Sequence, residues 1–105
     1  MYQLLRQGKI EEFNEARKNG KKCDLHGSNL RNVDLRGLNT EGLDFSNCYM
    51  RHTDLRGLNL RHCNLEGVSI HEAKISGAYF PRELSSSEIR LSWEHGTRMR
   101  YRAGT

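Results

Sequence analysis

The chain has few apolar residues and no long apolar run. Only 35% of its 105 residues are hydrophobic and 8% are aromatic, which is low for a conventional two-layer globule of one domain. No apolar run approaches the roughly 18 residues of a membrane-spanning helix. The opening MYQLLRQGK also lacks the hydrophobic stretch and cleavage site of a secretion signal. We therefore expect a soluble, cytoplasmic protein with a thin, linear core.

What the chain does have is a five-residue repeat from Cys23 to Arg82. The residue two before each central one is small or apolar, so two side chains in five are expected to point inward, as at i and i+2 of a strand. Asp or Asn often lies between them and Gly commonly ends the five, which predicts a corner in every repeat. Only Thr40 interrupts the apolar character of the central positions, which are Leu25, Leu30, Leu35, Thr40, Phe45, Met50, Leu55, Leu60, Leu65, Ile70, Ile75 and Phe80.

This pattern resembles the pentapeptide repeat family, whose motif is a small residue, Asp or Asn, Leu, any residue, and then often Gly. The resemblance covers about 60 of the 105 residues. It implies an all-β solenoid, a right-handed quadrilateral β-helix in which four pentapeptides make one coil, so that twelve repeats give about three coils. The chain itself also indicates a twenty-residue period, because VDLRG at 33–37 recurs as TDLRG at 53–57. Residues twenty apart should then stack at roughly 4.8 Å.

The two end segments are predicted to be helical caps of this single domain. In residues 1–22, the spacing of Ile10, Phe13 and Ala16 predicts a helix from about Lys9 to Lys18 that covers the first coil. A short helical turn carrying Leu4 and Leu5 should precede it. After repeats 23–82, residues 83–105 are predicted to form a helix and a basic tail. Ser85 and Glu88 have capping-box spacing ahead of a helix over 86–95, which Gly96 should end.

The tail from Thr97 to Arg102 alternates strictly and would place three Arg on one side of any strand it forms. Two alternatives remain open for it. The tail could fold back on the repeats, or it could pair with another copy of itself. Because members of the family often dimerise through their C-terminal ends, the resemblance makes a homodimer plausible.

Three Cys and five His invite a metal site, but their spacing argues against one. The cysteines fall at an inward repeat position, whereas His52 and His62 fall at corners two faces apart, and zinc needs four converging ligands. Cys23 and Cys63 would lie two coils apart, too far for a disulfide. We expect no metal, no cofactor and buried free thiols.

Patterns typical of enzymes are also missing. There is no G-x-x-x-x-G-K-S/T phosphate loop, and no nucleophile and base can be paired from the sequence. The serines at 85–87 are explained by helix capping and His95 by a helix C-terminus. We therefore expect a non-catalytic protein.

The formal net charge of +4 lies outside the repeats. Residues 23–82 carry seven Lys or Arg against seven Asp or Glu, so the repeats are neutral. The twenty-residue period nevertheless stacks Arg31 with Arg51 and Arg36 with Arg56, and such columns are tolerated when they are neutralised, most obviously by Asp34 and Asp54. Either these faces are solvated and self-neutralised, or they recognise anions. The candidate interaction surface comprises Arg31, Arg36, Arg51, Arg56, Tyr49, Arg98, Arg100 and Arg102.

The leading hypothesis is a small bacterial-type repeat protein that acts as a protein–protein interaction or scaffold module, with an unknown protein partner. The alternative is nucleic-acid binding or topoisomerase-related regulation through the Arg-rich faces and the basic tail. Some members of the family resemble DNA in shape and charge, but they are longer and acidic on the relevant face. A neutral stack of three coils departs from them in both respects.

Overall fold

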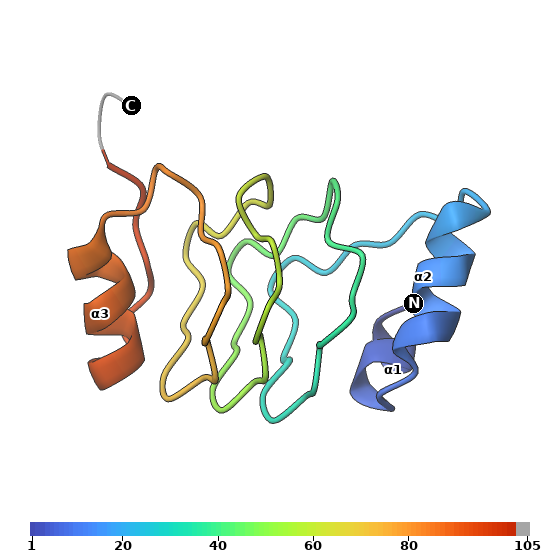
Figure 1. Cartoon of the computed structure of the whole chain (residues 1–105), viewed down its shortest axis with the longest axis horizontal. Coiled ribbons are helices and arrows are strands. Elements are labelled where there is room, and N and C mark those ends of the chain that lie inside the picture. Colours follow the sequence, from blue (N-terminus) through green and yellow to red (C-terminus); the bar gives the residue numbers. More distant parts are fainter. Residues whose placement is uncertain (103–105) are drawn as a thin grey trace.

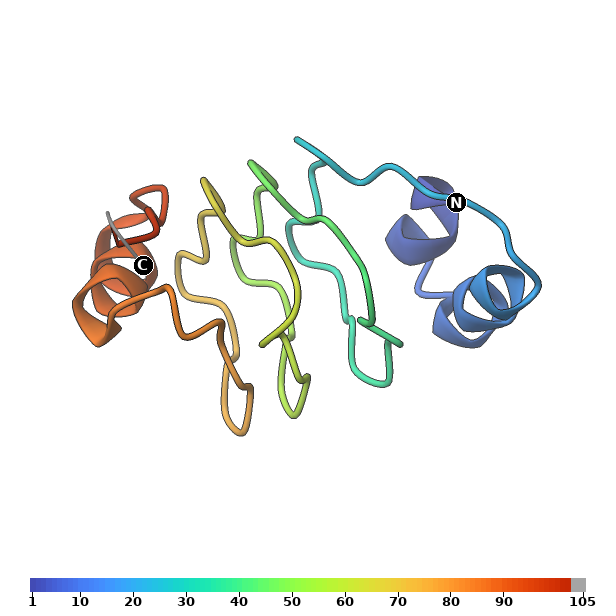
Figure 2. The ribbon, with the colours of Figure 1, turned by 90° about the horizontal axis from the view of Figure 1, so that it is seen from above.

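The computed structural model describes residues 1–102, which form a stack of coils between helical ends (Figure 1). The helices are α1 (Tyr2–Arg6), α2 (Ile10–Lys18) and α3 (Ser86–His95). Helices α1 and α2 lie at one end of the stack and α3 at the other, as the view from above also shows (Figure 2). None of the helices in this part of the chain has the length and apolarity needed to cross a membrane.

The prediction of an all-β solenoid, a right-handed quadrilateral β-helix, is wrong for this structure. Residues 1–102 contain no β-strand and no sheet. Their secondary structure consists of three short helices together with isolated parallel β-bridges, such as the one between Asp34 and Asp54. The coils are therefore linked by single bridges instead of continuous ladders.

The reason is that the backbone turns a corner before a second consecutive residue can pair. Corner residues have φ values in the left-handed region, including the non-glycine residues Asn32 at 62° and Glu72 at 54°. That region costs an ordinary L-residue roughly 1–2 kcal/mol, which explains why Gly and Asn hold most corners. Between corners only the residue that lies between the two inward positions forms a bridge, as Tyr49 does to Asn29 and Ser69. With a corner in each repeat, pairing between the coils is limited to these single bridges.

The predicted register of twenty residues is confirmed. Every isolated bridge joins residues twenty apart, for example Asp34 with Asp54 and Asp54 with Lys74. Backbone hydrogen bonds accompany the bridges: the Leu35 N–H donates to the Asp54 carbonyl at 3.0 Å, and the Asp54 N–H donates to the Val33 carbonyl at 2.9 Å. Equivalent positions of successive coils therefore lie side by side.

The predicted apolar column forms the core. Leu30, Met50 and Ile70 occupy the central position of three successive coils, and each is at most 1% exposed. The other inward position is buried as well, with Cys48 and Val68 at 0%. Because both positions face the axis, a chain with little apolar content buries most of the apolar residues in its repeats.

Thr40, the exception in this column, is half-buried and satisfies a backbone acceptor. Its hydroxyl donates to the Asn59 carbonyl at 2.7 Å. One coil further on, the equivalent carbonyl, that of Tyr79, instead accepts from the backbone N–H of Leu60 at 2.7 Å. A side-chain donor thus replaces the backbone donor at the position where the sequence breaks the pattern.

The N-terminal cap agrees with its prediction, with α2 beginning one residue later than expected. Phe13 of α2 and Leu5 of α1 are both fully buried and belong to the core cluster. Polar side chains of the two helices donate to carbonyls of the first coil: Tyr2 to Asn29 at 2.6 Å, Arg6 to Arg31 at 2.7 Å, Asn14 to Gly37 at 3.0 Å, and Arg17 to Glu41 at 2.6 Å. The cap therefore covers the apolar end of the first coil and donates hydrogen bonds to several of its carbonyls.

The C-terminal helix begins and ends where the sequence predicts. The Ser85 hydroxyl accepts from the Glu88 N–H at 3.1 Å, and Gly96 adopts a left-handed φ of 74°. Two residues of α3 bond to the last coil: the Ser92 hydroxyl accepts from the Ile70 N–H at 3.0 Å, and the Trp93 indole donates to the Ala73 carbonyl at 2.8 Å.

The tail after Gly96 folds back on the repeats, which was one of the two predicted alternatives. Met99 is fully buried, and its backbone pairs with the last coil, accepting from Gly67 at 2.7 Å and donating to Val68 at 2.9 Å. The Tyr101 hydroxyl accepts from the Leu65 N–H at 2.9 Å. The tail thus continues the stack past the point where the five-residue repeats end.

Candidate functional site

Two adjacent faces of the stack carry the predicted Arg columns. The first, the Asp–Arg face, comprises residues 33–37 and 53–57. The second, the open Arg face, comprises residues 28–32, 48–52 and 68–72. Bridges between Asp34 and Asp54 and between Asn29 and Tyr49 set the register on the two faces. They place Arg36 beside Arg56, and Arg31 beside Arg51.

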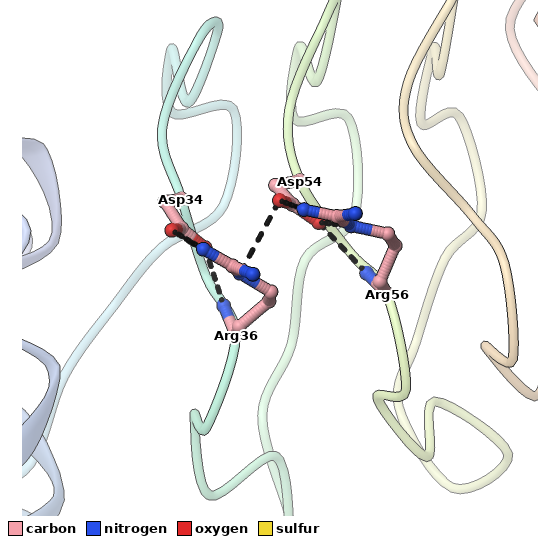
Figure 3. Close-up of polar contacts among 4 residues, drawn as sticks. All are labelled: Asp34, Arg36, Asp54 and Arg56. Atoms are coloured by element: carbon pink, nitrogen blue, oxygen red, sulfur yellow. Dashed lines mark hydrogen bonds and ion pairs between the residues drawn. The ribbon is translucent and has the colours of Figure 1, made fainter.

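On the Asp–Arg face each guanidinium is held by a carboxylate two residues earlier (Figure 3). Arg36 donates to both carboxylate oxygens of Asp34, with Nη2 to Oδ2 at 2.8 Å. Arg56 does the same with Asp54, with Nη2 to Oδ2 at 2.7 Å. Arg36 also pairs across the coils, because its Nε lies 3.3 Å from Asp54 Oδ2. The predicted neutralisation by Asp34 and Asp54 is confirmed.

Asp54 is the most strongly perturbed group of this face. Its pKa is lowered from 3.8 to about 2, first by hydrogen bonds from the Arg56 side chain, against the opposing effect of burial. The pKa of Asp34 is also lowered, first by the Arg36 side chain. The side chain of Asp54 is only 10% exposed, whereas that of Asp34 is 51% exposed. Asp54 therefore anchors both Arg36 and Arg56.

Replacing Asp54 by Asn is expected to lower the free energy of unfolding at pH 7 by about 1 kcal/mol, because it removes the charge and keeps an oxygen for the corner. Since the folded pKa lies below the unfolded value, the charge stabilises the fold above pH 3.8, and this is lost as the pH falls towards 2. Urea unfolding at pH 7, 3 and 2 measures the difference. Asp44→Asn is the control, because Asp44 accepts from the Ser46 N–H and has no Arg partner among residues 1–102. A difference between Asp54→Asn and wild type that is the same at all three pH values would contradict the assignment.

The open Arg face lacks such neutralisation. Among the described residues no carboxylate forms an ion pair with Arg31 or Arg51, both of which are exposed. The Arg51 Nε donates to His52 Nε2 at 3.3 Å. Glu72, a carboxylate of this face, contacts imidazoles instead, 3.6 Å from His52 Nδ1 and 3.3 Å from His71 Nε2. Two arginines at equivalent positions of successive coils are therefore exposed to solvent without a carboxylate partner among the described residues.

The C-terminal tail adds a further cation to the open Arg face. The guanidinium of Arg98 lies 4.7 Å from the centre of the Tyr49 ring and donates to the Tyr49 hydroxyl. It also donates to the Gly67 carbonyl at 3.0 Å. Tyr49 is 44% exposed, so this pair lies at the surface. Stacking on an aromatic ring fixes the guanidinium at low entropic cost.

The other two tail arginines contact different partners. Arg100 lies 3.4 Å from a Glu66 carboxylate oxygen, and Arg102 donates to the Arg82 carbonyl at 2.5 Å. The tail forms no strand, but its alternation persists, because Met99 is buried and Tyr101 is half-buried whereas Arg100 and Arg102 are exposed. Of the eight predicted surface residues, the open Arg face contains Arg31, Tyr49, Arg51 and Arg98.

One cation of this region escaped the sequence analysis. Arg6 of α1 donates to the carbonyls of Asn29 and Arg31, at the edge of the open Arg face next to the N-terminal cap. Nothing in the repeat pattern indicates it, because its position depends on how the cap docks. The sequence does, however, indicate the contrast between the two faces. An Asp lies two residues before Arg36 and before Arg56, whereas the residues two before Arg31 and Arg51 are Asn29 and Tyr49.

Cys48 and Cys63 are not activated thiols. Cys48 and Cys63 are buried and free, and the Cys48 thiol donates to the Leu25 carbonyl at 2.8 Å. Burial raises the pKa of Cys48 to about 11 and also raises that of Cys63. Since the thiolate is the nucleophilic form, neither residue is suited to covalent chemistry.

Stacked coils with a twenty-residue register and an axial column of apolar side chains define a repeat protein. The chain belongs to the pentapeptide repeat family: the model for pentapeptide repeats matches it in eight copies over residues 19–37 and 44–80, more than half of its length. The unmatched interval between these ranges contains Thr40. No curated protein and no solved structure was found to match the chain.

Proposed function

We propose that this protein is a non-catalytic interaction module that binds a partner protein through the open Arg face. The observation that carries the proposal is the difference between the two Arg columns. Arg36 and Arg56 are already paired with Asp34 and Asp54. Arg31 and Arg51 have no carboxylate partner within the described residues, so their donors can be used by another molecule.

The stack supports such a role energetically. Coils fixed by backbone hydrogen bonds and a buried core present side chains on a rigid frame, so binding requires little ordering. Arg is well suited to this use because its planar guanidinium recognises a carboxylate through two parallel hydrogen bonds.

Affinity capture from a cell lysate treated with nuclease tests the proposal. The double variant Arg31→Gln/Arg51→Gln is expected to lose the captured protein, while its thermal melt stays within a few degrees of wild type. The double variant Arg36→Gln/Arg56→Gln is the matched control, because it removes the same charge from the neighbouring face. Capture that survives the first variant, or that is lost equally in both, would contradict a role for the open Arg face.

The nucleic-acid alternative has its own outcome in the same experiment. Material that disappears on nuclease treatment and binds far more weakly at 200 mM than at 50 mM salt would favour it, because phosphate contacts release counterions. A protein partner retained after nuclease treatment favours the interaction module.

A further inference from the structure

We infer that the open Arg face binds an acidic segment of a partner protein in an extended conformation, with carboxylates at alternate positions, as in Glu-x-Glu. The inference rests on the proposed function and specifies the chemistry of the partner. It follows from where the structure places two cationic positions, the Arg31 and Arg51 column and the Arg98 guanidinium on Tyr49.

The first step is the spacing of these positions. Tyr49 and Arg51 flank Met50, which is fully buried, so their side chains leave the same face two residues apart. Arg51 begins the turn at this corner, so about 6.6 Å, the spacing of two residues in extended backbone, is the upper limit of the distance between the Tyr49 and Arg51 Cα atoms. Alternate side chains of an extended peptide repeat at the same distance. When one glutamate of the peptide binds the Arg31 and Arg51 column, the glutamate two residues away in the peptide therefore lies at Arg98.

The second step is the number of free donors. Arg51 uses its Nε towards His52 Nε2, which leaves both terminal nitrogens for an acceptor. Arg31 makes no side-chain hydrogen bond or ion pair within residues 1–102. Arg98 bonds to Asn47, Gly67 and Tyr49, which leaves two of the five N–H groups that a guanidinium carries. Each position can thus accept one carboxylate.

The third step is the extent of the charge. The adjacent Asp–Arg face is paired internally, and Glu72 borders the open Arg face on its exposed corner. The unpaired column itself covers only two coils, a span of roughly 5 Å between Arg31 and Arg51. A nucleic-acid strand gains affinity from many phosphates along a continuous basic surface. The unpaired column and Arg98 instead suit a short segment with two carboxylates.

Fluorescence anisotropy with two capped, labelled peptides tests the inference. One peptide contains Glu-Ser-Glu-Ser, and the other contains Glu-Glu-Ser-Ser with the same composition and charge. At about 50 mM salt, where exposed charges are weakly screened, the alternating peptide is expected to bind several-fold more tightly. Adjacent carboxylates of an extended peptide point to opposite sides, so the second peptide can present only one to the face.

Variants locate the site. Arg31→Gln/Arg51→Gln is expected to weaken binding of the alternating peptide about tenfold, since charge-assisted hydrogen bonds are lost. Arg98→Gln is expected to abolish the preference between the two peptides. Arg36→Gln/Arg56→Gln, with the same change in net charge as the first variant, is expected to bind like wild type. Thermal melts of all variants report folding.

Equal affinity for the two peptides would overturn the inference, as would equal weakening in both double variants. Tighter binding of a single-stranded thymidine oligonucleotide of equal charge, lost in the Arg31→Gln/Arg51→Gln variant, would also overturn it. If neither peptide binds but that variant still loses the protein captured from lysate, the inference fails while the proposed function stands.

Discussion

Replacing Phe13 by Ala is expected to lower the free energy of unfolding by about 3–5 kcal/mol, a large part of the stability of a typical domain. Phe13 is fully buried, and it belongs to a helix that lies outside the repeats. Its removal leaves a cavity between α2 and the first coil, and it weakens the docking that lets Asn14 and Arg17 reach the carbonyls of that coil.

Chemical denaturation measures this effect, and amide hydrogen exchange locates it. Glu12→Ala is the matched control, because Glu12 is an exposed neighbour on the same helix and should cost no more than about 0.5 kcal/mol. Exchange should accelerate first in the amides of the first coil that pair with the second, such as that of Leu30. A Phe13→Ala protein as stable as Glu12→Ala would mean that the N-terminal cap is dispensable.

Replacing Met99 by Ala is expected to cost about 2–5 kcal/mol, although the residue lies in a tail without regular secondary structure. Met99 is fully buried and pairs through its backbone with Gly67 and Val68. Truncating it removes apolar contacts over the last coil and loosens the segment that holds Arg98 on Tyr49.

Thr97→Ala is the control for this second prediction, because Thr97 is exposed and lies in the same tail. Urea unfolding should separate the two variants clearly. Exchange at the Gly67 amide, which donates to the Met99 carbonyl, should rise in Met99→Ala alone. Equal stability of the two variants would show that the tail contributes little to the core.

Local features of the chain could be predicted well from the sequence. The bounds of α3 were correct because Ser85, Glu88 and Gly96 act on their immediate neighbours. The register of twenty residues was also correct, since it depends on matching the repeat pattern to itself. These features need only local physical chemistry and internal periodicity.

The secondary structure of the repeats could not be predicted in the same way. Alternating inward positions such as Cys48 and Met50 indicate extended backbone, but whether extended residues form a strand depends on consecutive pairing between coils. Left-handed corners, held even by His52 at a φ of 58°, limit pairing to single bridges. The sequence pattern shows which residues point inward and says less about how many of them pair.

The candidate site was predicted in part. The two Arg columns follow from the register, and pairing of Arg36 and Arg56 follows from the Asp two residues earlier. The placement of Arg98 beside Tyr49 does not follow, because it depends on the path of a tail 49 residues away in the sequence. The repeat pattern predicts how repeats contact one another, but it does not predict where a segment outside the repeats will pack.

The hydrogen bonds from the N-terminal helices to the first coil also bear on self-association. A row of exposed carbonyls at the end of a repeat stack would invite another chain to add its own coil, as exposed sheet edges do. Here Tyr2, Arg6, Asn14 and Arg17 already occupy acceptors of that row. At the opposite end Ser92, Trp93 and Met99 occupy groups of the last coil. A second chain could pair with these particular groups only after the cap contacts had broken.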